Sequence, residues 1–312
     1  MLYPAELRAL RARRYSTTGL RHNRRKYPQK PRTTAGFSGA VGWLAVTPSA
    51  PITLCGSLSR YPVSLGAAMH LAGYRALGLS FTYVPFAVED LEGALAGMRA
   101  LRIRGFGVSM PYKLNVIPLL DRLDPLAARI GAVNTIVNDD GTLVGHNTDA
   151  WGAARALSEV MELQGRHATI IGAGGAARAV AYSLKQEGMR LHIVNRTPEK
   201  AERLADGLGV SAGALDSVNP EDAVINCSSA GMSEYGASSP LASTCLRPGL
   251  VVMDIVYKPV RTRLLAEAEA AGATTVSGAR MLLHQACRQF ELYTGQEAPL
   301  TAMDDALRQQ LE

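Results

Sequence analysis

The segment Gly172-Ala-Gly-Gly-Ala-Ala177 constrains the fold more than any other part of the chain. It lies between an apolar segment typical of a buried strand, Ala168–Ile171, and a segment with helical spacing, Ala176–Glu187. Glycines at such a junction allow a tight turn and a close approach of a pyrophosphate, whose charge the start of the helix favours. The segment therefore predicts a dinucleotide-binding Rossmann domain, and a plain tight turn is the alternative. The residues predicted to contact the cofactor here are Gly172, Gly174, Gly175 and Ala176.

The next predicted strand ends at Asn195-Arg196-Thr197. Enzymes that use NAD usually have an acidic residue at this place, which would repel a 2′-phosphate. Arg196 would attract that phosphate and can donate two hydrogen bonds to it, and Thr197 adds a hydroxyl donor. We therefore expect Asn195, Arg196 and Thr197 to favour NADP over NAD. The segment Asn226–Met232 closes a later strand, and Met232 is expected to lie on the nicotinamide side, with a plain loop as the alternative.

Two residues outside this region form a possible acid/base pair. Lys113 follows a predicted strand and Pro111, and Asp149 follows a predicted hairpin. Both would then lie at the carboxyl edge of a sheet, where α/β folds bind ligands. A lysine held by a carboxylate can exchange a proton with a reacting oxygen. A surface lysine and an aspartate at a helix start remain the alternative.

Strands alternate with helices along most of the chain, which predicts an α/β fold of mainly parallel sheets covered on both faces. The predicted strands are Thr53–Gly56, Phe81–Val88, Gly105–Ser109, Val133–Asn138, Thr142–His146, Ala168–Ile171, Arg190–Val194, Ala223–Asn226 and Val251–Val256. The predicted helices are Ser64–Leu77, Val88–Leu101, a piece leading to Asp121, Trp151–Val160, Ala176–Glu187, Pro198–Leu208, Arg263–Ala271 and Met281–Leu292. The Asp139-Asp-Gly141 sequence predicts a hairpin between two of the strands.

The 312 residues suffice for two domains. The last predicted helix carries an apolar stripe of Leu283, Ala286, Phe290 and Tyr293, and we expect it to return to the first domain. The expected division is a substrate-binding α/β domain of residues 51–149 plus 279–312 and a Rossmann NADP-binding domain of residues 150–278.

The net charge of +6 is unevenly distributed. Residues 1–50 carry ten Lys or Arg and one acid, whereas residues 51–312 carry 23 basic and 26 acidic side chains. We therefore expect a basic, disordered extension, with a secretory or organelle signal as alternatives, and no nucleic-acid partner. No apolar run is long enough to span a membrane, and the histidines and cysteines lack the spacing of metal ligands. The sequence thus favours a cytoplasmic protein without a metal.

Several motifs occur in an order and at a spacing similar to those of the shikimate dehydrogenase family. They are Gly105–Lys113, Gly131–Thr135, Gly145–Asp149, Gly172–Ala177, Asn195–Thr197 and Gly278–Gly295. The chain resembles this family over most of its length. Two segments, Leu54–Ser59 and Phe290–Gly295, are most similar to its diverged shikimate dehydrogenase-like branch.

The resemblance implies two α/β domains, NADP as cofactor, and the reversible reduction of 3-dehydroshikimate to shikimate, a small cyclic hydroxy acid of the chorismate pathway. It implies that Lys113 and Asp149 are the catalytic pair. Substrate contacts implied by the resemblance are Ser64, Ser109 (where the family has Thr), Asn134, Tyr257 and Gln285. Gly278, which opens the last motif, is expected to border the cofactor.

One departure concerns the two serines with which the family usually holds the substrate carboxylate. Pro62 and Ser64 occupy those places, and Pro62 has no N–H or hydroxyl donor. Ser57 or Ser59 could substitute if the loop is shifted. Quinate or aminoshikimate is therefore an alternative substrate, and an idle NADP-binding module is an alternative function. A monomer and a homodimer are both compatible with the sequence.

Overall fold

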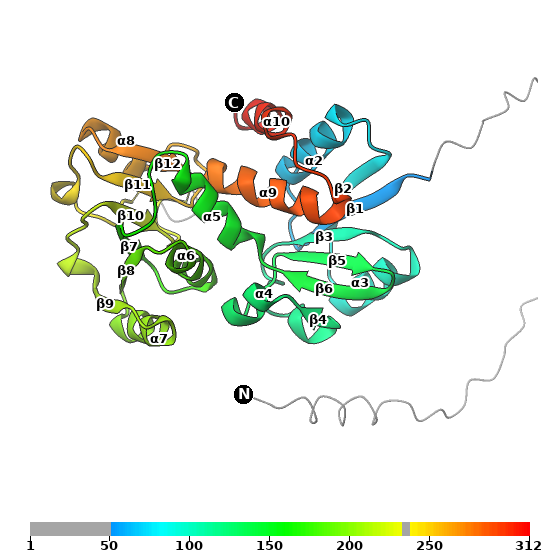
Figure 1. The fold of residues 1–312 in the computed structure, drawn as a ribbon, viewed down its shortest axis with the longest axis horizontal. Coiled ribbons are helices and arrows are strands. Elements are labelled where there is room, and N and C mark those ends of the chain that lie inside the picture. Colours follow the sequence, from blue (N-terminus) through cyan, green and yellow to red (C-terminus); the bar gives the residue numbers. More distant parts are fainter. Residues whose placement is uncertain (1–50, 233–237) are drawn as a thin grey trace, which may run out of the picture. The chain divides into compact units, whose positions relative to one another are not determined.

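The structure is a computed structural model that describes residues 51–232 and 238–312. The predicted disordered extension and its signal-peptide alternatives fall in residues 1–50, outside the described residues. Two six-stranded sheets, each covered by helices, make up the described chain (Figure 1). The predicted α/β fold class is confirmed. Within the described ranges no helix is both long and apolar enough to cross a membrane.

The first sheet has the strand order β2-β1-β3-β5-β6-β4. Its strands are β1 (Thr53–Ser59), β2 (Phe81–Ala87), β3 (Gly105–Val108), β4 (Arg122–Leu123), β5 (Thr135–Asp139) and β6 (Thr142–His146). Strand β1 is parallel to β2 and β3, whereas β5 is antiparallel to both β3 and β6. The predicted hairpin is confirmed, because Asp140 and Gly141 adopt positive φ angles of 47° and 92° between its strands. This hairpin makes the sheet mixed, and three of its five strand pairings are parallel, in agreement with the predicted mainly parallel arrangement.

The second sheet is parallel throughout, with the order β12-β11-β10-β7-β8-β9. Its strands are β7 (His167–Ile171), β8 (Arg190–Asn195), β9 (Ser211–Ala214), β10 (Ala223–Asn226), β11 (Val251–Asp254) and β12 (Thr274–Ser277). The strand order reverses beside β7, which is the doubly wound arrangement of a Rossmann fold.

Helices follow most strands and begin and end at residues suited to those places. They are α2 (Leu65–Ala76), α3 (Leu91–Ala100), α4 (Pro125–Ile130), α5 (Thr148–Ser158), α6 (Gly175–Gln186), α7 (Pro198–Leu208), α8 (Arg263–Ala270), α9 (Gly278–Thr294) and α10 (Leu300–Leu311). The carboxylate of Asp124 accepts the N–H of Leu126 at 2.7 Å at the start of α4. Left-handed glycines, Gly209 and Gly295, end α7 and α9.

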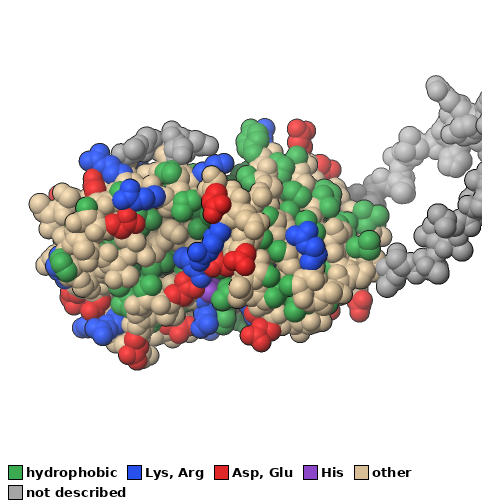
Figure 2. Space-filling view, turned by 90° about the horizontal axis from the view of Figure 1, so that it is seen from above, with side chains coloured by type: hydrophobic (Ala, Val, Ile, Leu, Met, Phe, Trp, Pro, Cys, Tyr) green, Lys and Arg blue, Asp and Glu red, His purple; other side chains and the backbone are tan. Residues whose placement is uncertain are grey.

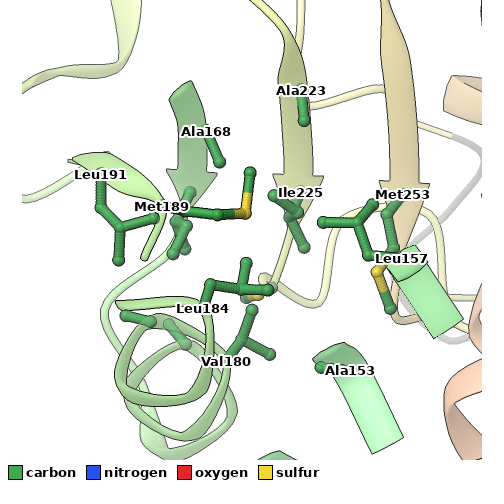
Figure 3. Packing of buried hydrophobic residues seen from close by; sticks show 14 of the residues in the cluster. Ala153, Leu157, Ala168, Val180, Leu184, Met189, Leu191, Ala223, Ile225 and Met253 are labelled. Atoms are coloured by element: carbon green, nitrogen blue, oxygen red, sulfur yellow. The ribbon is translucent and has the colours of Figure 1, made fainter. Parts of the chain in front are cut away.

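One core of the second sheet lies between its strands and the helices α5, α6 and α7 (Figure 3), and a second core includes α8. Ala168 and Ile225, from neighbouring strands, lie opposite Val180 and Leu184 of α6. All four side chains are fully buried. Small residues such as Ala168 let the helix approach the sheet closely.

Helix α9 returns to the first sheet, as predicted. Its residues Leu283, Phe290 and Tyr293 are buried in one cluster with α2 and α10. Arg104, just before β3, donates to the last carbonyls of this helix, Leu292 O at 3.3 Å and Tyr293 O at 3.0 Å. A guanidinium at this end compensates both the unpaired carbonyls and the negative end of the helix dipole.

Helices α5 and α9 cross in close contact. A Cβ placed on Gly152 of α5 would lie 2.6 Å from the carbonyl oxygen of Met281 and 2.9 Å from the backbone nitrogen of Gln285. Only glycine fits here, because the nearest atoms of α9 belong to its backbone or to the Cβ of Gln285 and cannot move aside. The contact lies one turn after Asp149, so it places the start of α5 against Gln285.

Acidic and basic side chains lie side by side near the middle of the face shown in Figure 2. Ion pairs join α5, α9 and α10: Arg280 lies 2.5 Å from Glu159 and 2.7 Å from Asp304. Burial acts to raise the pKa of Glu159, but hydrogen bonds from Arg280 and His284 outweigh it, so this pKa lies below its usual value. The network fastens the end of α5 to the last two helices.

We expect Gly105→Ala to destabilise the protein, because its Cβ would lie 2.1 Å from the ring of Tyr293, which is 2% exposed. Such overpacking should lower the free energy of unfolding by about 3 kcal/mol in a urea titration. Gly97→Ala is the matched control, since its Cβ would meet nothing within 4 Å in the described chain. It should stabilise α3 by up to ~1 kcal/mol. Equal effects of the two substitutions would mean that α9 does not pack on β3.

Candidate active site

Lys113 and Asp149, predicted as an acid/base pair, are in direct contact. Lys113 Nζ lies 2.6 Å from Asp149 Oδ2, and the two side chains are 34% and 14% exposed. Lys113 belongs to the turn after β3, and Asp149 to the first turn of α5. A lysine that is one-third exposed beside a largely buried carboxylate can both meet a ligand and be held in place.

The start of α5 is fixed by side chains that satisfy its free N–H groups. Asn147 accepts the N–H of Ala150 at 3.2 Å and donates to the carbonyl of Ala132 at 3.1 Å. Because Asp149 follows in the first turn, the positive end of the helix dipole favours its negative charge. The second member of the pair is therefore held by the helix start and does not depend on a flexible loop.

Asn134, predicted as a substrate contact, joins this pair. It precedes β5, and its Nδ2 donates to Asp149 Oδ1 at 2.8 Å and lies 3.3 Å from Gln285 Oε1. Its Oδ1 accepts the backbone N–H of Thr148 at 2.7 Å. The structure thus brings together Lys113, Asp149, Asn134 and Gln285, which lie in four separate segments of the sequence.

A buried layer beneath these residues was not predicted. Gln289 donates to Thr135 Oγ1 at 2.9 Å and to the carbonyl of Asn134 at 3.2 Å, and Thr135 donates to Asn134 Oδ1 at 2.9 Å. Thr148 is the third buried member of the layer. The sequence did carry a signal, since Gln285 and Gln289 are four residues apart and therefore share one face of α9.

Three other predicted substrate contacts are not joined to this cluster by any hydrogen bond within residues 51–232 and 238–312. Ser109 is exposed at the end of β3, and its backbone N–H donates to Leu58 O at 3.0 Å. Ser64 precedes α2, and its hydroxyl donates to Gln310 of α10 at 3.4 Å. Tyr257 is partly exposed after β11. By contrast, Ser59 Oγ is buried and has no hydrogen-bond partner in the described chain.

The loop that carries Tyr257 is anchored by a buried acid, Asp254. This side chain is fully buried at the end of β11 and accepts hydrogen bonds from Thr262 Oγ1 at 2.7 Å and from Asn226 Nδ2 at 3.0 Å. Burial raises the pKa of Asp254, and these hydrogen bonds oppose the shift without cancelling it. The bond to Thr262 closes the loop of residues 255–261 against the sheet.

The predicted dinucleotide segment has the geometry expected of a phosphate seat. Gly172 has a φ of +118°, and a Cβ there would lie 3.1 Å from the backbone of Cys227. A Cβ on Gly174 or Gly175 would meet nothing within 4 Å among the described residues, so the backbone at the start of α6 is open to a ligand. Ala176 is partly buried and follows them in the first turn. These features fit a pyrophosphate at a helix start.

The segment at the end of β8, Asn195–Thr197, presents two side chains with free donors, Arg196 and Thr197. Asn195 Nδ2 donates to the carbonyl of Thr197 at 2.9 Å, which shapes the turn before α7. The side chains of Arg196 and Thr197 are exposed and make no hydrogen bond to another described residue. An exposed guanidinium without a carboxylate partner suits the 2′-phosphate of NADP.

Two further predicted cofactor residues lie at other places along the sheet. Gly278 begins α9, and a Cβ there would lie 2.4 Å from Ile255 O, so only glycine fits. Met232 is partly buried, and its backbone N–H donates to Ser229 O at 3.2 Å. Residues 233–237, which follow it, lie outside the described residues.

A Rossmann sheet with an open phosphate seat is the arrangement of a dinucleotide-binding protein. Three family models match the chain: the shikimate dehydrogenase substrate binding domain over residues 61–136, shikimate / quinate 5-dehydrogenase over 154–239, and the shikimate 5′-dehydrogenase C-terminal domain over 278–308. The chain belongs to the shikimate dehydrogenase family.

Individual relatives agree with this assignment. The chain is 46% identical to the shikimate dehydrogenase (NADP(+)) of Methanothermobacter thermautotrophicus over 262 residues, which are 80% of this chain and 93% of that protein. It is similar to the crystal structure of shikimate 5-dehydrogenase from Thermus thermophilus in complex with NADP(H) and shikimate, with a TM-score of 0.78 and 35% identity over 83% of this chain and 99% of that one. The 5-ketofructose reductase of a Gluconobacter species is also similar, with a TM-score of 0.78 and 33% identity over 84% of this chain and all (100%) of that one.

We expect the buried bond between Gln289 and Thr135 to appear as a coupling in a double-mutant cycle. Gln289→Leu and Thr135→Val should each lower the free energy of unfolding by about 1–3 kcal/mol, because each removes hydrogen bonds between buried polar groups. The double variant should lose less than the sum by ~1 kcal/mol in urea titrations. Gln309→Leu with Thr301→Val, both exposed on α10, is the control cycle and should be additive. Additivity in both cycles would show that the Gln289–Thr135 bond is absent.

Proposed function

We propose that the protein is an NADP-dependent shikimate dehydrogenase that reversibly reduces 3-dehydroshikimate to shikimate. The observation that carries the proposal is the contact of Lys113 with Asp149 and of Asp149 with Asn134, at 2.6 and 2.8 Å. The names of the relatives support the reaction, and the open seat at Gly174 and the free Arg196 support NADP.

The proposal also assigns the residues of the chain to two domains. Residues 51–149 plus 279–312 are assigned to a substrate-binding domain and residues 150–278 to the Rossmann NADP-binding domain. Support comes from the first sheet, which carries Lys113 and Asn134, and from the second, which carries Gly172 and Arg196. We also propose that the protein has no nucleic-acid partner, because residues 51–312 have more acidic than basic side chains. A monomer or homodimer in the cytoplasm is part of the same proposal.

In this proposal three parts of the second sheet would hold the cofactor. The backbone at Gly172, Gly174, Gly175 and Ala176 takes the pyrophosphate, and Asn195, Arg196 and Thr197 take the adenosine 2′-phosphate. Met232 and Gly278 border the nicotinamide. When bound, NADPH supplies the hydride that reduces the ring ketone.

The chain itself supplies the proton and the electrostatic stabilisation. As the ketone oxygen gains negative charge, the Lys113 ammonium stabilises it and donates a proton. Asp149 keeps Lys113 in position, and Asn134 and Gln285 hold the ring hydroxyls. Ser109 and Tyr257 complete the substrate contacts. In the oxidation direction Lys113 takes the proton from the alcohol.

Recognition of the substrate carboxylate concerns Pro62, Ser64 and Ser59, and these residues support two candidate substrates. Ser64 already donates to Gln310, and Pro62 has no donor, which favours a second candidate function, the reduction of a ring ketone that lacks this carboxylate. The similar 5-ketofructose reductase acts, by its name, on a ketosugar. The buried and unpaired hydroxyl of Ser59 supports an acid, because it is a free donor at the end of β1.

A substrate panel tests the proposal. Steady-state rates with shikimate, quinate, aminoshikimate and 5-ketofructose should be measured with NADP and NAD, each in the direction that its oxidation state allows. The proposal expects the highest kcat/KM with shikimate and NADP. A higher kcat/KM with quinate or the ketosugar would replace it by one of those activities. If the protein turns over none of these substrates, the function that remains is that of an idle NADP-binding module.

We expect Lys113→Ala to lower kcat by about 10²–10⁴-fold, because the developing oxyanion loses its proton donor. The dissociation constant of NADP, from a fluorescence titration, should stay within about twofold of wild type, since Lys113 lies outside the phosphate seat. Arg75→Ala, exposed on α2, is the control and should leave both quantities unchanged. A parallel loss of turnover and NADP binding would contradict a catalytic role for Lys113.

We expect Arg196→Ala to raise the Michaelis constant for NADP by about 10–100-fold and to spare that for NAD, because only NADP carries the 2′-phosphate. Steady-state titrations of both cofactors provide the measurement. Arg190→Ala, an exposed arginine at the opposite end of β8, is the matched control and should change neither constant. If the Arg196→Ala variant still prefers NADP to NAD, residues other than Arg196 bind the 2′-phosphate.

A further inference from the structure

A buried histidine of α2, His70, is a titratable group that the proposed reaction does not use. Its side chain is fully buried where α2 packs against α9 and the first sheet (Figure 1). Its ring is stacked on that of Tyr83 of β2, with centroids 4.4 Å apart and planes 7° apart, and it lies 6.3 Å from the ring of Phe290 of α9. Neighbouring rings on two sides hold the imidazole in one plane, so its two nitrogens face fixed partners.

His70 is uncharged at neutral pH. Burial lowers the pKa of its ring to about 4, because an imidazolium there would lose its hydration, and the side chain of Gln289 opposes this shift only in part. A neutral imidazole has one N–H, which donates, and one bare nitrogen, which accepts. The partners of the two nitrogens decide which of them carries the proton.

The amide of Gln289 has a defined orientation beside this ring. Its Nε2 lies 3.2 Å from the backbone carbonyl oxygen of Asn134 and 2.9 Å from Thr135 Oγ1. A carbonyl oxygen can only accept, so the amide atom that faces Asn134 must be the nitrogen. Oε1 is therefore the end of the Gln289 amide that can accept a hydrogen bond from a third residue.

Nε2 of His70 is the nitrogen on the side of Gln289. It is buried and makes no hydrogen bond of standard geometry within residues 51–232 and 238–312. The opposing effect of Gln289 on the pKa of His70 is that of an acceptor near the ring, which fits Oε1 of the amide. Because an unpaired buried donor costs about 1–3 kcal/mol, this contact gains free energy if it closes to a hydrogen bond.

The other nitrogen of the ring, Nδ1, lies 3.5 Å from the hydroxyl of Tyr74, which follows one turn later on α2. Burial raises the pKa of this hydroxyl, so Tyr74 keeps its proton and can donate it. If Nδ1 accepts from Tyr74, the proton of the neutral ring is on Nε2, where Gln289 offers an acceptor. The partners on both sides of the imidazole thus favour the same tautomer.

We propose that the contact closes to a hydrogen bond from His70 Nε2 to Gln289 Oε1, which makes His70 a positioning residue of the active site. This inference rests on the proposed function, because it gives His70 a part in that reaction. Gln289 is bonded to the backbone of Asn134, whose amide donates to Asp149 at 2.8 Å. Since His70 is fully buried, it would act on a ligand only through these residues.

The bond would prevent the Gln289 amide from turning over. In the reversed orientation, Oε1 would face the carbonyl oxygen of Asn134, and two acceptors repel each other. Asn134 would then shift, and with it the carboxylate that contacts Lys113. A misplacement of about 1 Å at a reacting group can lower a rate by roughly 10²-fold.

The kinetic test uses two substitutions that separate the N–H from the ring. His70→Gln keeps an N–H near the place of Nε2 but loses the ring, whereas His70→Phe keeps a ring but loses the N–H. With shikimate and NADP, we expect His70→Phe to lower kcat by about 10-fold and His70→Gln by less than about threefold. The Michaelis constant for NADP should stay within about twofold in both. Tyr293→Phe is the matched control and should leave kcat unchanged, because this buried hydroxyl has no partner among the described residues.

The order of the two variants decides between positioning and packing. A greater loss of kcat in His70→Gln than in His70→Phe, or equal kcat in His70→Phe and wild type, would overturn the proposal. The effect of His70→Phe should also vanish when Gln289 is already replaced by Leu, since His70 acts through that amide. Additive losses in the double variant would contradict it.

A measurement on the wild-type protein tests the tautomer without any assay of activity. In a nitrogen-15 NMR spectrum of labelled histidines, with His70 assigned by its absence in His70→Gln, we expect the proton on Nε2. A proton on Nδ1 would overturn the proposal. Failure of the proposed function shows separately, as a wild-type protein that does not turn over shikimate, and the variants are then compared on the panel substrate with the highest kcat/KM.

Discussion

The amide side chain of Asn134 holds the candidate active site together, because it is bonded at both ends. Its oxygen accepts the backbone N–H of Thr148 and so fixes the start of α5, and its nitrogen donates to Asp149. The carboxylate that contacts Lys113 is thereby oriented before a ligand arrives. Groups held in this way need little rearrangement when charge develops on a bound oxygen, which is the main source of electrostatic catalysis.

Helix α9 contributes to both sheets, and the position of Asn134 depends on it. Met281, near its start, belongs to the core of the second sheet, whereas Phe290 and Tyr293 belong to that of the first. Between them, Gln285 and Gln289 form hydrogen bonds with Asn134. Packing and hydrogen bonding of a single helix thus set the geometry of residues that come from distant parts of the chain.

The sequence was most informative where local rules are strong. Gly172, the Asp139–Gly141 turn and the apolar stripe of α9 predicted the seat, the hairpin and the returning helix. Prediction was poorer for short elements: β9 (Ser211–Ala214) contains small residues of low strand propensity, and α4 has only six residues. The strands β4 and β12 and the helix α10 were likewise missed. The layer under Asn134 could not be predicted, because it depends on side chains that only tertiary packing brings together.

The glycine at position 152 has a consequence for how the two sheets can move. Helices that touch backbone to backbone cannot slide past each other without a steric clash, whereas helices separated by long side chains can. With α5 and α9 in contact at this residue, shear between the halves of the molecule is blocked. Any opening or closing around a ligand is therefore left to bending of these helices rather than to sliding of one along the other.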